Sequence, residues 1–177
     1  NILVGLLLGD GCIEILPKGN TARLKLEYSA KHKAYIDWLY EVFRAWVINS
    51  PKRKVTHVFG QSYEKYWFTT LSSPYFKEFF DLFYVNHRKI VPPTIGELLT
   101  PIGFAVWFMD DGSTKSKQSH GRILCTHAFS AEEIKLLCDV LKKKFFLDSS
   151  PRRQKDGIEI YISGHSLARL RTWVEPF

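Results

Sequence analysis

Cysteine is scarce in this chain of 177 residues. Cys12, Cys125 and Cys138 are its three cysteines, and none of them stands in a Cys-x-x-Cys pair. An odd number of widely spaced cysteines argues against a disulfide framework and against a zinc site. This usage fits a reducing compartment, so we expect an intracellular protein.

Long hydrophobic runs are also missing. The run from Ile2 to Leu8 is interrupted by Gly5, has no basic residues before it, and is far shorter than the roughly 20 residues that cross a membrane. We therefore expect neither a signal peptide nor a membrane anchor. The chain starts at Asn1 without a methionine or a helix cap, which leads us to expect preceding residues.

The composition is that of a folded domain or of two small fused domains. Hydrophobic residues make up 45% and charged residues 24%, and aromatic residues are abundant at 15%. The net charge is +7 and the pI is about 9.3. This excess of positive charge favours an acidic polymer or surface as a partner.

An internal repeat organises the chain. The segment LVGLLLGDG (3–11) is echoed by FAVWFMDDG (104–112), so that Asp10 and Asp111 are equivalent at an offset of 111 − 10 = 101. Segments 26–39 and 124–137 match at an offset of 98, and segments 71–83 and 162–174 at 91. We predict an N-terminal half (1–91), a proline-containing linker (92–100) and a C-terminal half (101–177).

Each half reads as αββαββα, which predicts an α+β fold. An apolar helix ends at Asp-Gly, where glycine would provide a left-handed cap. The predicted strands are 12–16, 22–30, 54–59 and 63–71, then 114–117, 122–129, 152–155 and 158–163. The other predicted helices are 33–46, 75–83, 131–146 and 166–173.

Three local patterns support these elements. The charged residues Arg23, Lys25 and Glu27 alternate with apolar residues, which is typical of a sheet with one buried face. Ser130 followed by Glu133 predicts a helix-capping box. The turn at 155–157 contains Asp-Gly and predicts a hairpin.

The repeated helices end in carboxylates, which is unusual. A carboxylate at a helix C-terminus is disfavoured by about 0.3–1 kcal/mol. Gly5 and Gly9 would allow close packing against another helix, so we expect the two copies to pair with Asp10 and Asp111 at one edge. Two such carboxylates suit Mg²⁺, which can activate water and neutralise a leaving oxygen. The alternative is that each Asp-Gly only forms a turn.

These motifs resemble those of the double-motif LAGLIDADG homing endonucleases over essentially the whole chain. The resemblance implies two αββαββα halves packed through the motif helices, with antiparallel sheets forming a saddle on double-stranded DNA. It implies a monomer that makes metal-dependent double-strand breaks in a long, near-asymmetric target and leaves 3′ overhangs. It further implies Mg²⁺ or Mn²⁺ as cofactor, Ca²⁺ as a non-cleaving substitute, and an organelle as the setting.

Site residues are carried over from the family by motif match. The resemblance makes Asp10 and Asp111 the catalytic metal ligands, with Gly9 and Asp110 beside them. Asp110 stands where the family motif has alanine, and Val106 stands where it has glycine.

Two further positions match the family's active site. Lys89 corresponds to its basic residue; the alternative is a surface cation like its neighbour Arg88. Its repeat equivalent would be residue 89 + 91 = 180, beyond Phe177. Glu27, paired by the repeat with Cys125, matches a polar position near the attacking water.

DNA-binding residues are predicted from strand alternation. Side chains that face away from the helices could read base edges: Arg23, Lys25, Lys65, Trp67, Thr69, Arg152, Gln154, Glu159 and Tyr161. Cations near strand ends and loops would contact phosphates: Lys52, Arg53, Lys54, Lys115, Lys117 and Arg122. Arg153 and Lys155 are also predicted to bind DNA. For any one of them, a solvated strand face is the alternative.

Two other functions stay open on the sequence. One is an RNA maturase or intron-splicing factor on the same fold, and the other is a catalytically inactive DNA-binding protein. Retention of both Asp10 and Asp111 favours the nuclease, since RNA binding needs neither carboxylate.

Overall fold

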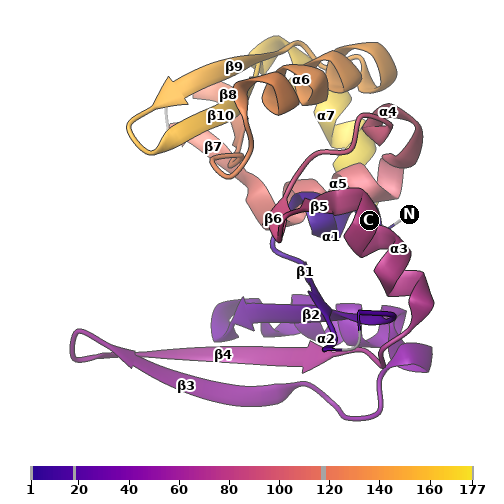
Figure 1. Cartoon of the computed structure of the whole chain (residues 1–177). Helices are drawn as coiled ribbons and strands as arrows, with labels where there is room; N and C mark the ends of the chain where they lie inside the picture. Colours follow the sequence, from indigo (N-terminus) through magenta and orange to yellow (C-terminus); the bar gives the residue numbers. More distant parts are fainter. Residues whose placement is uncertain (1, 18, 117–118, 177) are drawn as a thin grey trace. The chain divides into compact units, whose positions relative to one another are not determined.

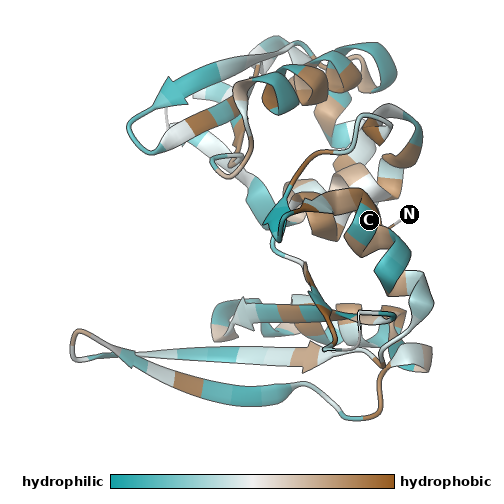
Figure 2. Cartoon of the chain, viewed as in Figure 1, coloured by the Kyte–Doolittle hydropathy of each residue, from teal (hydrophilic) through white to brown (hydrophobic). Residues whose placement is uncertain are grey.

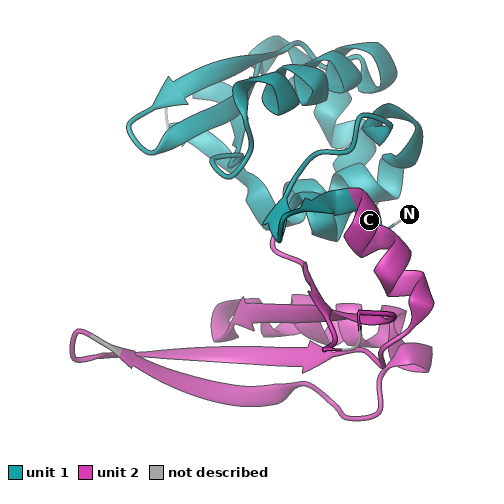
Figure 3. Ribbon diagram, viewed as in Figure 1, with its two compact units in different colours: residues 1–9, 83–177 teal, residues 10–82 magenta. Residues whose placement is uncertain are grey.

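The computed structural model describes residues 2–17, 19–116 and 119–176. The chain divides into two compact units, one of residues 10–82 and one that joins residues 1–9 to residues 83–177 (Figure 3). Each unit combines helices with an antiparallel sheet, so the α+β prediction is confirmed.

The unit of residues 10–82 is built on a four-stranded sheet in the order β1-β2-β4-β3 (Figure 1). Leu24, Leu26 and Phe68 from this sheet are buried together with Ile36 and Leu39 of α2. The elements are β1 (Cys12–Ile15), β2 (Ala22–Ser29), α2 (Lys33–Val42), β3 (Lys52–Val58), β4 (Gln61–Thr69) and α3 (Pro74–Phe83), with 3₁₀ turns at Ala30–His32 and Arg44–Trp46.

The second unit contains α1 (Ile2–Leu8) and a second four-stranded sheet in the order β7-β8-β10-β9. Helices α6 and α7 contact this sheet, and Figure 2 shows hydrophobic and hydrophilic bands alternating along α6. The other elements are β5 (Tyr84–Val85), β6 (Arg88–Lys89), α4 (Ile95–Leu98), α5 (Pro101–Asp111), β7 (Gly112–Ser116), β8 (Ser119–Leu124), α6 (Ala131–Phe145), β9 (Ser149–Gln154), β10 (Gly157–Ile162) and α7 (Leu167–Val174), with a 3₁₀ turn at Gly164–Ser166.

Strand registers confirm the internal repeat. Cys12 lies opposite Lys25 in the first sheet, and Ser113 lies opposite Ile123 in the second. These two pairs are related by offsets of 113 − 12 = 101 and 123 − 25 = 98, the values found in the sequence. The two sheets therefore share strand order, and the compared pairs of their first two strands share register.

Helix α1 packs directly against α5, as the repeat predicted. A Cβ added to Gly5 would lie 2.1 Å from the backbone oxygen of Gly103, so the two backbones meet with no side chain between them. Around this contact, Leu6, Leu7, Phe104 and others are fully buried. Val106, which replaces the family's glycine, is also fully buried, and Gly103 supplies the close approach one turn earlier.

Two of the local predictions, the helix-capping box and the hairpin, were confirmed. Ser130 and Glu133 form the reciprocal capping box at the start of α6. The β9–β10 hairpin turns between Gln154 and Gly157, and Gly157 takes a φ of 150°.

Several expectations about local structure were wrong. Gly112 is extended (φ −75°, ψ 134°) rather than left-handed, because β7 begins directly at the end of α5. The strand predicted over 122–129 ends at Leu124, and the helix predicted over 33–46 breaks after Val42. Within the proline-containing stretch, α4 forms a helical turn whose Ile95 is fully buried, so tertiary packing outweighs the local turn signals.

Within the described part of the chain, no helix combines the length and the apolar character that crossing a membrane requires.

The Gly5–Gly103 contact yields a stability prediction. The substitution Gly5→Ala would place a methyl group against backbone and should lower the free energy of unfolding by about 2–3 kcal/mol, measured by urea denaturation. Gly96→Ala in α4 is the matched control, because its Cβ would lie 3.4 Å from Val140 and needs no rearrangement. A Gly5→Ala variant as stable as the parent would contradict this packing.

Candidate active site and nucleic-acid interface

The ends of α1 and α5 meet closely within one unit. A Cβ added to Gly9 would lie 2.5 Å from the Asp110 Oδ2 atom, so the carboxylate of Asp110 occupies the space beside Gly9. The backbone amide of Gly9 donates to the Gly5 carbonyl oxygen at 3.0 Å and continues α1 to this point. A glycine is therefore required where the first motif meets the second.

The carboxylate of Asp111, the last residue of α5, is oriented by the indole of Trp107. Trp107, one turn earlier and fully buried, donates from Nε1 to Asp111 Oδ2 at 3.1 Å. The Asp111 carbonyl oxygen accepts from the Cys125 amide at 3.1 Å. The side chain and the backbone of Asp111 are thus both held. The role of Trp107 was not predicted, and its i, i+4 spacing from Asp111 is the local signal that could have indicated it.

A short hairpin of β5 and β6 brings Lys89 to Gly9, just after the end of α1. Asn86 and His87 form a two-residue turn with positive φ values of 49° and 61°, which aligns β6 with β5 and sets Lys89 opposite Tyr84. The Lys89 Nζ atom donates to the Gly9 carbonyl oxygen at 2.8 Å. A cation at a helix C-terminus is electrostatically favourable.

The hairpin is itself anchored. The Ile90 amide donates to the Phe83 carbonyl oxygen at 2.7 Å, and the Val91 amide donates to Glu133 Oε1 at 2.8 Å. Glu133 also belongs to the capping box of α6. The position of Lys89 therefore depends on Gly9 after α1, on Phe83 at the end of α3, and on Glu133 in α6.

The structure thus brings Gly9, Lys89 and Asp110 together, with Asp111 adjacent to Asp110 in the chain, while Asp10 belongs to the other unit. Carboxylate and carbonyl oxygens are the ligands that hard divalent cations take, so this donor set fits Mg²⁺ in its chemistry. Among the residues that the structure describes, no group of three or more His, Cys, Asp or Glu side chains is gathered closely enough to hold a metal.

The first sheet presents a charged face, which we call the N-terminal open face. Residues opposite each other in an antiparallel sheet share a face, and alternate residues along a strand do too. The registers place the following residues on this face: Cys12, Glu14, Arg23, Lys25, Glu27, Lys52, Lys54, Lys65, Trp67 and Thr69.

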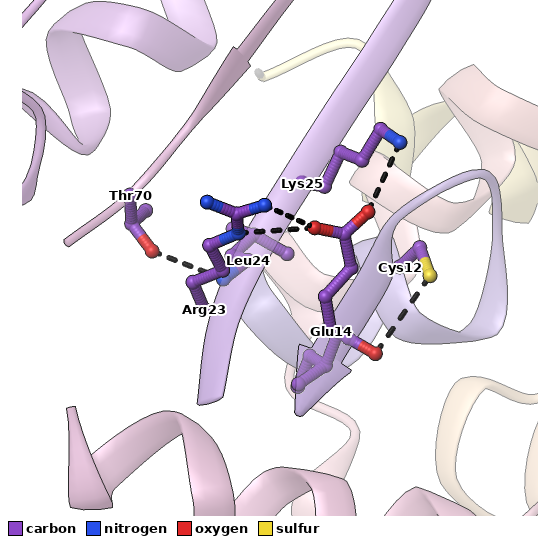
Figure 4. A network of polar contacts seen from close by, with 7 residues as sticks. Cys12, Glu14, Arg23, Leu24, Lys25 and Thr70 are labelled. Atoms are coloured by element: carbon purple, nitrogen blue, oxygen red, sulfur yellow. Dashed lines mark hydrogen bonds and ion pairs between the residues drawn. The ribbon is translucent and has the colours of Figure 1, made fainter. Parts of the chain in front are cut away.

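Glu14 holds two of the predicted base-reading cations (Figure 4). Its carboxylate lies 2.8 Å from Arg23 Nη2 and 3.0 Å from Lys25 Nζ. Partial burial acts to raise the pKa of Glu14, but hydrogen bonds from Lys25 and Arg23 outweigh it and leave this pKa below its usual value. The hydrogen bond to Glu14 raises the pKa of Lys25. Glu14 was not among the predicted site residues, because it lies beside Arg23 only through strand register.

Glu27, matched to a position near the attacking water, lies in a second ion-pair cluster. Lys65 Nζ is 3.0 Å from its carboxylate and Lys54 Nζ is 3.7 Å away. The hydrogen bond from Lys65 lowers the pKa of Glu27. Next to this cluster, Lys52 Nζ stands 5.7 Å from the centre of the Trp67 ring.

Arg53 lies on the opposite face of the same sheet. Strand register pairs it with Tyr66, and its guanidinium contacts the Glu64 carboxylate at 2.6 Å. The structure therefore separates Arg53 from its neighbours Lys52 and Lys54, which lie on the N-terminal open face.

The second sheet has an equivalent face, the C-terminal open face, formed by Lys115, Arg152, Gln154, Glu159 and Tyr161. Arg152 lies opposite Glu159, and Gln154 Nε2 donates to Glu159 Oε2 at 3.0 Å. Lys115 Nζ lies 4.8 Å from the centre of the Tyr161 ring.

The remaining predicted DNA contacts of this half lie elsewhere. Arg122 donates to the carbonyl oxygens of His120 and Gly121, and Arg153 lies opposite Ile158 on the helix side. Lys155 lies in the β9–β10 turn, and Lys117 lies outside the described residues.

Comparison with known proteins identifies relatives along the whole chain. A family model described as the LAGLIDADG DNA endonuclease family matches residues 1–170. A Wickerhamomyces canadensis protein named as a probable intron-encoded endonuclease is 31% identical, with 99% of this chain and 78% of that protein covered. A cytochrome b mRNA maturase of Debaryomyces hansenii is 27% identical, with 99% of this chain and 68% of that protein covered.

A solved structure has the same fold. The homing endonuclease I-WcaI bound to its DNA recognition sequence superimposes with a TM-score of 0.93 at 29% identity. The match covers 99% of this chain and 79% of that one.

The ion pairs of the N-terminal open face yield a pH prediction. Because folding lowers the pKa values of Glu14 and Glu27 below the usual 4.5, their contribution to stability is complete above that pH. It is lost as the pH falls through the lower folded-state values. The wild type should therefore lose more unfolding free energy between pH 6 and pH 3 than Glu14→Gln/Glu27→Gln, measured by chemical denaturation. Parallel losses would contradict the assignment.

Proposed function

We propose that this chain, which belongs to the LAGLIDADG DNA endonuclease family, is a site-specific homing endonuclease that cuts both strands of a long, near-asymmetric DNA target as a monomer. The observation that carries the proposal is the meeting of the motif helices, where Lys89, Gly9 and Asp110 are in contact and Trp107 orients Asp111. We further propose 3′ overhangs and an organelle setting, supported by the family resemblance.

Asp10 and Asp111, with the Gly9 carbonyl oxygen and Asp110 beside them, would hold the divalent ion. Bound there, Mg²⁺ or Mn²⁺ would polarise the scissile phosphate and lower the pKa of a water molecule, while Ca²⁺ would bind without supporting cleavage. These carboxylates lie at helix C-termini, where a cation relieves their unfavourable interaction with the helix dipole.

The protein's own residues have separate tasks in this reaction. The Trp107 indole fixes the orientation of the Asp111 carboxylate, which limits the positions that its ligand oxygen can take. The Lys89 ammonium, held by the Gly9 carbonyl oxygen, supplies positive charge next to the phosphate and a donor that can orient water. Glu27 would accept a proton or order water only after its cations, Lys54 and Lys65, engage DNA.

Recognition of DNA is assigned to the two open faces. An antiparallel ribbon can enter the major groove, where Arg, Lys and Gln side chains read base edges. In the free protein, Arg23 and Lys25 are held by Glu14, and Arg152 faces Glu159. Bases and phosphates of the DNA would compete with these carboxylates for the cations. Because cations that contact phosphates release counterions, binding should depend steeply on salt.

An RNA maturase is the second candidate, since the Debaryomyces hansenii relative carries that name. Such an activity would use the same basic faces without any need for the motif carboxylates. The nuclease proposal takes precedence because Asp10, Asp111 and Lys89 are all retained.

The first test is cleavage of a DNA library with Mg²⁺. The wild type should cut a discrete site, and Asp10→Asn and Asp111→Asn should each lower the cleavage rate at least about a hundredfold while DNA affinity is kept. Asp37→Asn, on the exposed ion pair of α2, is the matched control and should cut normally. No cleavage of any target, together with tight RNA binding, would overturn the nuclease proposal in favour of the maturase.

The second test removes the Lys89 ammonium. Lys89→Met should lower the single-turnover cleavage rate about a hundredfold and leave DNA affinity nearly unchanged, because the charge acts at the reacting phosphate. Lys135→Met, on the exposed surface of α6, should have neither effect. Equal losses in affinity for both variants would show that Lys89 is only one more surface cation.

A further inference from the structure

The hairpin of β3 and β4 extends beyond the sheet that carries it (Figure 1). Strand β2 pairs with β4 as far as Lys65, opposite Ser29. The four pairs from Val55–Glu64 to Val58–Gln61 continue as a two-stranded ribbon. A two-stranded ribbon without a third strand or a helix is only marginally stable in water.

The end of this ribbon carries polar groups that partner one another. Tyr63 donates from its hydroxyl to Gln61 Oε1 at 2.8 Å, and Ser62 Oγ lies 2.9 Å from His57 Nδ1. Tyr63 also shares a face with Lys65, because the two are alternate residues of one strand. The ribbon thus prolongs the N-terminal open face with hydrogen-bonding groups.

The turn itself is chemically unexpected. Residues 59 and 60 connect Val58 to Gln61, with φ values of 47° at Phe59 and 75° at Gly60, which is the two-residue turn that favours Asn-Gly. A bulky side chain in the left-handed region is strained, and such strain is concentrated at functional positions. Glycine adopts a positive φ without strain, so Gly60 suits this turn, whereas the same conformation is unfavourable for Phe59.

The Phe59 side chain is not buried by the rest of the described chain. Its relative exposure is 102%, so its ring has no shelter in the folded chain. Phe146 is a useful comparison: it too has a left-handed backbone (φ 56°) and is 67% exposed, but its ring lies 5.8 Å from the Arg169 guanidinium carbon. Phe59 therefore combines strain with full exposure at the end of a polar ribbon.

The DNA major groove offers one apolar group to such a ring, the 5-methyl group of thymine. We propose that Phe59 contacts the methyl group of a thymine near one end of the bound site and thereby sets the base preference there. This rests on the proposed function, because the ribbon must enter the major groove of the target. Contact with DNA would cover apolar surface that is otherwise left in water.

The test uses a variant that removes the Phe59 ring but keeps the conformation of the turn. Asparagine suits the left-handed conformation, so Phe59→Asn should be at least as stable as the wild type in thermal unfolding while it lacks the ring. Phe146→Asn makes the same change at a left-handed, exposed phenylalanine that caps α6, and is the matched control. Phe59→Leu keeps an apolar side chain.

Each protein is first used to select duplexes from a random DNA library in Ca²⁺. Each thymine of the selected site is then replaced in turn by deoxyuridine, which removes only the methyl group, and affinities are measured. For the wild type, one replacement should weaken binding about fivefold or more. Phe59→Asn should be insensitive to that same replacement, whereas Phe59→Leu and Phe146→Asn should respond like the wild type.

The outcomes separate this inference from the proposed function. If the wild type selects no duplex, the proposed function fails and the inference falls with it. If it selects a site but no deoxyuridine replacement matters, or Phe59→Asn remains equally sensitive, the inference alone is overturned. If Phe59→Asn unfolds at a markedly lower temperature, the ring has a structural role and the inference is again wrong.

Discussion

The contact between the backbones of α1 and α5 is the constraint on which the rest of the structure depends. Gly5 and Gly103 allow it, because a single methyl group at Gly5 would collide with a carbonyl oxygen. One turn further along, Gly9 faces the Asp110 carboxylate. A helix pair this close holds Gly9, Asp110 and Asp111 together, so a change in the helix interface moves these three residues of the candidate site.

The candidate site collects charge where helix geometry opposes it. Asp110 and Asp111 end α5, and only nearby positive charge or hydrogen-bond donors make that placement tolerable. The structure supplies an indole for Asp111 and the Lys89 ammonium for the Gly9 carbonyl oxygen. An arrangement that is costly for stability is well suited to holding a divalent cation, which is the chemistry that the proposed function needs.

Much of the fold followed from local patterns, because the αββαββα repeat, the Arg23–Glu27 alternation and the Ser130 capping box are written in short stretches of sequence. What the sequence could not reveal depends on distant partners. Helix α4 exists because Ile95 is buried, and Lys89 reaches Gly9 through a two-residue turn at Asn86 and His87 that no periodicity signals. Glu14 meets Arg23 only through strand register. The roles of the site residues came from motif resemblance, and local physics alone would have left each as a possible turn or surface cation.

The central claim is that the paired motif helices hold a divalent ion at the DNA backbone. Anomalous scattering from a crystal of this protein with its selected DNA and Mn²⁺ tests it most directly. We expect an anomalous peak bound by the Asp10 and Asp111 carboxylates next to a phosphate. Intact DNA on the two open faces, with no anomalous peak at these carboxylates, would contradict it.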